Sequence, residues 1–447
     1  MRTVTESRKE IPVIAETEVL VVGGGPAGLA AALAAAREKT DTMLVERFGC
    51  FGGNITQAAV ESIAWYRHNG TVESQGIGLE FEQRALEMHA SWPEPQSDSQ
   101  ALDTELFKVV ADRLIIESGV RPLLHCLGVR PIVEEGVVKG VITESKSGRQ
   151  AILAKRVIDA SGDADLAHRA GAPCTMAPVQ ELLGVTVNFA CSGVDARRFL
   201  TYVKQQHPTL KDWCVKTSGK ENGLFSPFIR EPFEKAKAAG EIPEDVGLGG
   251  TWGTVTPDGE VTHLNVVYMP GYDPTDVRDL TRGEMDGRRQ AVWAVEALKK
   301  YAPGFEKARL RNFSTALGIR ESRKIVGRCR LTEQDVRSQG RFEDSIGIFP
   351  EFLDGYGVVI IPTTGRYFQV PYGITLPQTV ENLLVAGRCV AGDQGSHAAT
   401  RAMTCCALTG QGTGVAAAQS IKDGKTTREV DIHKVQKALE KQGVRIR

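Results

Sequence analysis

A glycine cluster near the N-terminus has the spacing of a backbone turn that holds a diphosphate. The turn comprises Gly23, Gly25, Pro26, Ala27 and Gly28. It follows the apolar run 18–22 and precedes strong helix formers at 29–39. The first glycine permits a tight turn, the second lets the backbone approach a ligand, and the third lets helix and strand pack closely. The N–H groups of the helix start would then face the negative charge of the ligand.

An acidic residue stands where a dinucleotide fold requires one. Glu46 ends the apolar run 42–45, about 20 residues after the turn, and Arg47 follows it. Its carboxylate can accept hydrogen bonds from the ribose hydroxyls of an adenosine, and it would repel a 2′-phosphate. The order strand, turn, helix, strand therefore predicts a βαβ unit that binds FAD or NAD rather than NADP.

Three further small-residue segments could bring backbone close to the same cofactor. They are Gly52-Gly53-Asn54, Ala160-Ser161-Gly162, and the segment from Gly387 that ends in Gly392-Asp393. The second follows a strand at 156–159, and the third follows an apolar run at 383–387. A plain NAD dehydrogenase does not need a glycine pair directly after its acidic residue, so a larger cofactor is indicated.

These segments together resemble a known family. The stretches VLVVGGGPAGLAAALAAAR, ERFGCFGGNIT, RVIDASGDADLAHRAGAP, ALGIRESRKIVG and VPYGITLPQTVENLLVAGRCVAGD span nearly the whole chain. They resemble the broad bacterial family of FAD-dependent oxidoreductases, with the glutathione-reductase type of FAD domain. The resemblance implies FAD. It also implies that Asp393, after Gly392, holds the ribitol hydroxyls, and that the next helix points its N-terminus at the flavin N1–C2=O edge.

Four side chains are the candidates for chemistry. His397, four residues after Asp393, is either the base that takes a substrate proton or a residue that packs at the helix start. Arg401 either faces the flavin pyrimidine or a substrate carboxylate, or forms an ion pair between domains. Arg320 and Arg323, three apart on one face of an expected helix, either anchor an anion or belong to a salt-bridge cluster with Glu321.

Two aromatic groups are candidates for walls of the site. Trp65 and Tyr66, with His68, are expected to roof the active site. Tyr367, Phe368 and Tyr372 are either core residues or part of the cofactor box.

The elements that must position these residues define an α/β fold. We expect a Rossmann-like FAD domain with a parallel sheet, extended by a β-meander over 121–158, and built from N- and C-terminal segments. The expected limits are 1–171 for the first segment, 172–370 for an inserted α+β substrate domain, 371–421 for the second segment and 422–447 for a charged C-terminal tail. Segments 310–338 and 398–421 are expected to be helical, and the second is rich in small residues for close packing.

Composition is that of an ordinary globular protein. The chain has 447 residues, 42% hydrophobic and 24% charged, with a formal net charge of −1, so neither nucleic acid nor a membrane surface is an expected partner. The nine cysteines have no CxxC pair and no zinc spacing, so we expect no metal, free thiols and a cytoplasmic location. Assembly into a homo-oligomer is left open.

The expected function is an FAD-dependent oxidoreductase that moves a hydride between flavin N5 and a small polar organic substrate. One alternative is an FAD-dependent monooxygenase that hydroxylates a small aromatic substrate. Another is a flavin-binding electron-transfer subunit of a larger complex. The sequence leaves the substrate, the electron acceptor and covalent flavin attachment undetermined.

Overall fold

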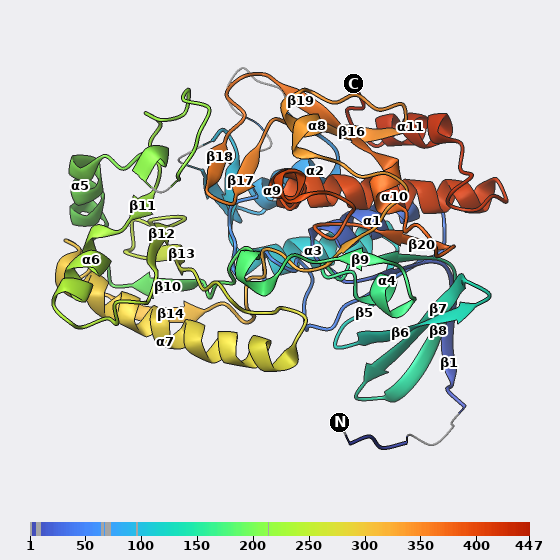
Figure 1. Ribbon diagram of the computed structural model, residues 1–447, viewed down its shortest axis with the longest axis horizontal. Coiled ribbons are helices and arrows are strands. Elements are labelled where there is room, and N and C mark those ends of the chain that lie inside the picture. Colours follow the sequence, from blue (N-terminus) through green and yellow to red (C-terminus); the bar gives the residue numbers. More distant parts are fainter. Residues whose placement is uncertain (1, 6–9, 64–66, 68–72, 95–96, 213) are drawn as a thin grey trace.

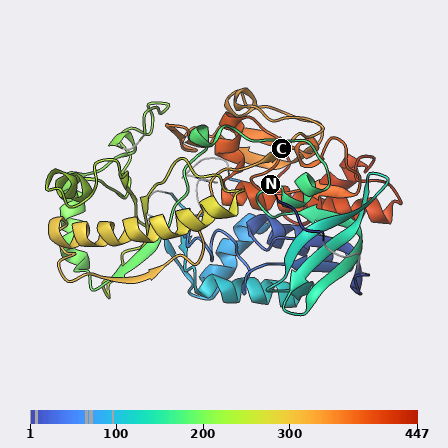
Figure 2. The same ribbon diagram turned by 60° about the horizontal axis from the view of Figure 1, so that its bottom comes forward.

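The structure is a computed structural model that describes residues 2–5, 10–63, 67, 73–94, 97–212 and 214–447. The chain forms two lobes, each with its own sheet and hydrophobic core (Figure 1 and Figure 2). The long helix α7 (Val277–Tyr301) runs along the smaller lobe, and the larger lobe contains both the beginning and the end of the described chain.

A seven-stranded sheet organises the larger lobe. Its strands are β1 (Val13–Val22), β2 (Thr42–Val45), β5 (Arg121–Leu123), β6 (Leu127–Glu134), β7 (Val137–Ser145), β8 (Gly148–Asp159) and β20 (Leu383–Val385). The adjacent pairs β5–β2, β2–β1, β1–β8 and β8–β20 are parallel. An antiparallel meander is formed by β6, β7 and β8. Strand β8 has 12 residues, so its first part pairs with β7 and its last residues pair with β20. The expected Rossmann-like sheet with an attached meander is confirmed.

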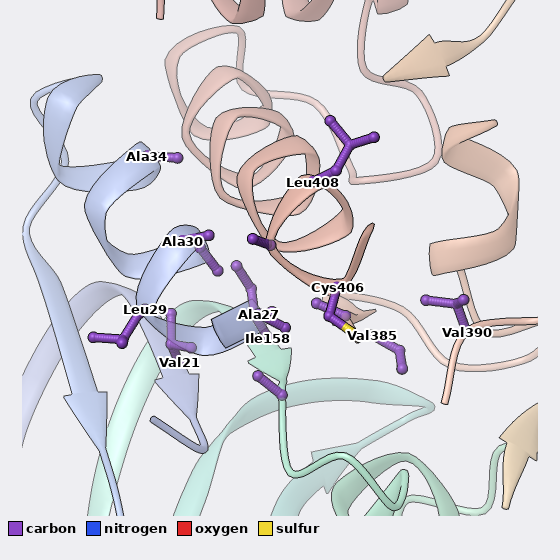
Figure 3. Packing of buried hydrophobic residues seen from close by; sticks show 14 of the residues in the cluster. Val21, Ala27, Leu29, Ala30, Ala34, Ile158, Val385, Val390, Cys406 and Leu408 are labelled. Atoms are coloured by element: carbon purple, nitrogen blue, oxygen red, sulfur yellow. The ribbon is translucent and has the colours of Figure 1, made fainter. Parts of the chain in front are cut away.

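Two helices from opposite ends of the chain cross in direct backbone contact beside this sheet. They are α1 (Pro26–Arg37) and α10 (Met403–Lys422). A Cβ added to Gly410 would lie 2.0 Å from the carbonyl oxygen of Ala27, and one added to Gly414 would lie 2.3 Å from that of Ala31. Figure 3 shows Ala27 and Ala30 of α1 beside α10, above the sheet residues Val21, Ile158 and Val385. The expected close packing of the small-residue helix is confirmed.

The remaining elements of the larger lobe surround this crossing. Its other helices are α2 (Ile77–Glu87), α3 (Leu106–Ser118), α4 (Asp165–Arg169), α8 (Glu333–Arg337), α9 (Gln394–Thr400) and α11 (Ile432–Lys441). Its two-stranded pairs are β3 (Ser91–Pro93) with β4 (Gln100–Leu102), β9 (Cys174–Thr175) with β15 (Lys324–Ile325), β16 (Ser345–Pro350) with β19 (Tyr367–Pro371), and β17 (Leu353–Gly355) with β18 (Val358–Ile360).

The smaller lobe is an α+β unit. Its sheet has the order β11 (Phe228–Ile229), β12 (Leu248–Thr251), β13 (Val261–Val267), β10 (Phe189–Ser192) and β14 (Arg309–Phe313). Helices α5 (Ala196–Gln206), α6 (Glu231–Ala238) and α7 accompany it. The second hydrophobic core draws its buried residues from Val185 to Leu317, whereas buried side chains from Ile325 to Val370 belong to the core of the larger lobe. We therefore propose that the inserted unit ends near residue 318 rather than 370.

Several local expectations differ from the structure. Segment 310–338 contains strands β14 and β15 and only the short helix α8, because its apolar positions pack against two different lobes. The helix expected over 398–421 is split into α9 and α10 by Arg401 and Ala402. The charged C-terminal tail packs into the larger lobe, where its side chains Val435, Leu439, Val444 and Ile446 are buried.

The crossing of α1 and α10 makes a stability prediction. An alanine in place of a helical glycine normally stabilises a helix by about 1 kcal/mol. In the variant Gly414→Ala, overpacking against Ala31 should instead cost about 1–3 kcal/mol and lower the Tm. Thermal unfolding followed by circular dichroism measures this.

The matched control is Gly223→Ala, because nothing lies within 4 Å of a Cβ added there. Its Tm should stay close to that of the wild type. A Gly414→Ala protein as stable as the control would contradict the backbone contact.

Candidate active site

One large cavity, of about 730 Å³, joins the two lobes. Its wall in the larger lobe includes the glycine turn, the end of β2 and the end of β20. Its wall in the smaller lobe includes residues of β12 and β13, and the β17–β18 hairpin also contributes. The cavity therefore connects the predicted cofactor residues with the sheet of the inserted unit.

The glycine turn is shaped by close backbone contacts. Gly23 has φ +106°, and a Cβ there would lie 2.3 Å from the carbonyl oxygen of Ala160. A Cβ on Gly28 would lie 1.7 Å from the carbonyl oxygen of Gly23, so Gly28 serves the packing of α1 and does not line the cavity. Gly23, Gly25, Pro26 and Ala27 do line it.

The glycine pair that follows β2 lies directly against the turn. A Cβ on Gly53 would lie 2.5 Å from the Cα of Gly25, so the two backbones are in contact at these positions. Gly53 and Asn54 line the cavity. Gly52 does not; its N–H donates to the carbonyl oxygen of Gly24 at 2.8 Å and so ties the two segments together.

Glu46 is buried and held by two backbone donors. Its carboxylate accepts hydrogen bonds from Gly24 N at 2.5 Å and from Phe48 N at 2.9 Å. These bonds fix the orientation of the carboxylate at the rim of the turn. Glu46 and the exposed Arg47 both line the cavity.

The small-residue turn after β8 completes this wall. Asp159, fully buried, accepts from Ser161 N at 3.0 Å and from Leu166 N and Ala167 N at 2.9 Å. Its carboxylate thereby fixes the loop that leads into α4. Ala160, Ser161 and Gly162 line the cavity as a result.

The expectation for Gly392 and Asp393 requires a correction. Neither residue lines the cavity. Asp393 is the N-cap of α9, where its carboxylate accepts from Ser396 N at 2.7 Å and from Glu333 N at 3.1 Å. The seven-residue helix α9 therefore separates Asp393 from the helix whose start reaches the cavity, namely α10.

Residues near β20 and α10 line the cavity, whereas Gly392 and Asp393 do not. Gly387 and Arg388, directly after β20, line the cavity, as do Arg401, Ala402 and Met403 at the start of α10. No side chain caps α10, so its first N–H groups remain available as donors at the cavity wall. Arg388 donates to Asp163 at 2.5 Å, and its Nε has no partner among the described residues.

His397 lies away from the cavity. Its ring is 1% exposed, and Nε2 lies 3.1 Å from the carbonyl oxygen of Arg320. Burial, followed by the charges of Lys324 and Arg401, lowers the pKa of His397 well below its usual value. His397 is absent from the cavity lining, so we do not assign it the role of the substrate base.

Arg320 and Arg401 both line the cavity. Arg401 forms an ion pair of 2.7 Å with Asp354 and also donates to the Asp354 carbonyl oxygen. Arg320 and Arg323 are not on a helix face, because the segment that contains them is not helical. Arg323 instead pairs with Asp165 at 2.6 Å.

Three ionisable cavity residues were not expected from the sequence: Glu61, Glu94 and His263. Burial raises the pKa of Glu61 to about 8 and that of Glu94 to about 7, whereas burial and then the charge of Arg320 lower the pKa of His263 to about 4. The only sequence signal is that His263 and Asn265 interrupt an otherwise apolar strand pattern.

The deep end of the cavity therefore contains neutral groups that can exchange protons. Thr262 Oγ1 donates to Glu61 at 2.9 Å. The Nε2 atom of His263 is buried without a hydrogen-bond partner among the described residues. Near neutral pH, Glu61 is a protonated acid and His263 an uncharged imidazole.

The aromatic candidates divide into two groups. Tyr367, Phe368 and Tyr372 do not line the cavity; Phe368 and Tyr372 are buried core residues, and the Tyr372 hydroxyl donates to the carbonyl oxygen of Thr427 at 2.9 Å. Trp65, Tyr66 and His68 lie outside the described residues.

The described residues contain no group of three or more His, Cys, Asp and Glu side chains arranged to hold a metal ion. They also contain no helix with both the length and the apolar character needed to cross a bilayer.

Comparisons with known proteins identify similar chains. A family model described as FAD dependent oxidoreductase matches residues 18–439. Digeranylgeranylglycerophospholipid reductase 2 of Methanopyrus kandleri is 30% identical over 64% of this chain and 78% of its own. Digeranylgeranylglycerophospholipid reductase 1 of the same organism is 24% identical over 77% and 98%. The crystal structure of a geranylgeranyl bacteriochlorophyll reductase-like protein from Thermoplasma acidophilum has a TM-score of 0.49 and 14% identity, covering 95% of this chain and 83% of that one.

The buried acid at Glu61 predicts how stability depends on pH. The native state holds a proton on Glu61 up to about pH 8, whereas the unfolded chain releases it above about 4.5. The contribution of Glu61 to stability is therefore complete below pH 4.5 and is lost as the pH rises to 8. Glu61→Gln should reduce this loss, so that the variant gains Tm relative to the wild type at pH 8 but not at pH 4.5.

The control is the exposed Glu134→Gln, which should leave the pH dependence of Tm unchanged. Glu94 contributes a pH dependence of stability with the same sign, and this contribution remains in both variants. Equal pH dependence of Tm in Glu61→Gln and in the wild type would show that Glu61 is ionised in the native protein.

Proposed function

Since the chain belongs to the FAD dependent oxidoreductase family, we propose that it moves a hydride between bound FAD and a small polar organic substrate in the same cavity. The observation that carries this proposal is that the dinucleotide turn and the buried proton-exchanging groups line one continuous cavity. Cofactor and substrate would therefore meet without a movement of either lobe.

The described residues fit FAD at the larger lobe. The proposed contacts of the diphosphate are Gly23, Gly25, Pro26 and Ala27, where Gly25 has no side chain to keep a ligand from the backbone. Glu46 and Arg47 would hold the adenosine ribose, and Gly53, Asn54 and Ala160–Gly162 would line the adjoining wall. Gly28 and Gly52 would act indirectly, by holding the turn in shape.

The start of α10 fits the flavin end better than Asp393 does. Arg388 and the uncapped N–H groups of α10 present positive charge and donors to the cavity. Bound FAD would supply a hydride acceptor or donor at its ring system. The role of this chain is then to bind and orient FAD, place the substrate beside it and handle the substrate proton.

We assign the proton to the pair of groups at the deep end of the cavity. A substrate that loses a hydride from carbon commonly also loses a proton from oxygen or nitrogen, and the reverse reaction takes one up. Glu61, protonated near neutral pH, can donate a proton, and the unpartnered Nε2 of His263 can accept one. Both side chains line the cavity and are buried, so water competes little with the substrate for proton exchange with them.

A polar substrate fits this cavity better than the lipid named for the Methanopyrus kandleri relatives. A long hydrocarbon chain would leave the buried Oε2 of Glu94 and Nε2 of His263 without partners among the described residues, which is unfavourable. These atoms instead favour a ligand with several hydrogen-bonding groups.

The direct test is an anaerobic screen of the FAD-loaded protein against small polar metabolites. Loss of the visible absorption of oxidised flavin with one substrate, without NAD(P)H or oxygen, is the expected result. Consumption of NAD(P)H and oxygen with hydroxylation of an aromatic ring would instead support a monooxygenase. Turnover only after addition of a partner protein would support an electron-transfer subunit.

The proton assignment makes a separate prediction for the substrate found in that screen. For reduction of the substrate, the rate of the wild type should fall as the pH rises through about 8, because Glu61 loses its proton. In Glu61→Gln this decrease of the rate near pH 8 should disappear, and kcat should be about 10²–10⁴-fold lower than in the wild type. Stopped-flow measurement of flavin oxidation against pH provides the data.

The FAD content of Glu61→Gln should match that of the wild type, because Glu61 is not one of the proposed FAD contacts. If the rate of this variant still decreased near pH 8, a group other than Glu61 would donate the substrate proton.

A further inference from the structure

We propose that the substrate is a monocarboxylate whose carboxylate group binds the guanidinium of Arg320. This inference rests on the proposed function, which makes the cavity the substrate site. It adds the chemical class of the substrate and the residue that recognises it.

Arg320 lies deep between the lobes, and the surface that it exposes belongs to the cavity lining. Its Nη1 donates to the carbonyl oxygen of Gly184 at 2.9 Å, and its Nη2 donates to Oδ1 of Asn265 at 3.0 Å. The ring of Tyr268 lies 5.2 Å from its Cζ. All of these partners are uncharged, and Arg320 forms no ion pair with a carboxylate of the described residues.

Neighbouring arginines differ from Arg320 in this respect. Arg388 pairs with Asp163 at 2.5 Å, and Arg401 pairs with Asp354 at 2.7 Å. Arg230 also lines the cavity but is exposed, so water can solvate its charge. Among the cavity arginines, Arg320 is therefore the half-buried one that has no carboxylate partner in the described part of the chain.

The nearby carboxyl groups do not neutralise Arg320. Glu61 is protonated near neutral pH, and Asp354 is engaged by Arg401. Glu321, the next residue in the chain, is fully buried and pairs with Lys324 at 2.6 Å. Burial, followed by repulsion from Arg401, lowers the pKa of Arg320 to about 10, which leaves it charged at neutral pH.

A buried charge without a counterion is costly, and an anionic ligand would offset that cost. The guanidinium has five N–H donors in a planar fork, of which the two described bonds use only part. That fork matches the two oxygens of a carboxylate.

The charge balance favours a carboxylate over a phosphate ester. One uncompensated positive charge matches one negative charge. A phosphate monoester carries about 1.5–2 negative charges at pH 7, so it would leave unpaired negative charge in a buried site.

The test measures ligand binding rather than turnover. Isothermal titration calorimetry at pH 7 would titrate oxidised, FAD-loaded protein with acetate, lactate and benzoate. Acetamide, benzamide and phenyl phosphate serve as matched neutral and dianionic probes. We expect saturable binding of at least one carboxylate and at least about 10-fold weaker binding of its matched neutral or dianionic probe.

The variants Arg320→Met and Arg320→Lys separate charge from geometry. Arg320→Met should weaken carboxylate binding by about 10- to 100-fold, and Arg320→Lys by less, because it keeps the charge but loses the fork. The FAD content and the circular dichroism spectrum of both should match those of the wild type. Arg230→Met, which removes an exposed charge from the same cavity, should change binding less than about twofold.

Equal binding of carboxylates by Arg320→Met and the wild type would overturn the proposal, as would preference for the amides or for phenyl phosphate, or no saturable binding of any carboxylate. Loss of FAD in both Arg320 variants would assign Arg320 to the cofactor and also overturn it. A protein that binds carboxylates through Arg320 but transfers no hydride would refute the proposed function and leave the carboxylate site standing.

Discussion

The backbone contact between α1 and α10 is the constraint on which the rest of the structure depends. Gly410 and Gly414 bring α10 against the carbonyl oxygens of Ala27 and Ala31. The segment after β20 also lies beside the glycine turn, since a Cβ added to Gly387 would lie 3.2 Å from the Cβ of Ala27. Helix packing at this crossing thus determines the shape of the cofactor wall.

The opposite wall of the cavity contains groups that are unfavourable in a core with a purely structural role. Within the described part of the chain, Arg320 has no carboxylate partner, Glu61 is a buried acid and Nε2 of His263 has no hydrogen-bond partner, and each of these reduces the stability of the fold. Such groups are typical of sites that bind and transform a ligand. The extensive apolar core of the larger lobe and the second core of the smaller lobe can support that cost.

Local patterns were predictable from the sequence, and long-range positions were not. The turn at 23–28, Glu46 and strand β20 follow from short periodicities and glycine spacing, and the structure has them where expected. The sequence around Asp393 suggested a ribitol contact, but α9 intervenes and makes Asp393 its cap. The non-helical chain at Arg320 and the burial of Glu61 and His263 arise only when the two lobes meet.

A crystal structure of the FAD-loaded protein would show whether the cofactor occupies the cavity between the lobes. We expect the diphosphate to lie over the turn at 23–28 and the flavin ring to lie between the start of α10 and the side chains of Arg320 and His263. A flavin ring beside Asp393, outside the cavity that joins the lobes, would contradict this expectation.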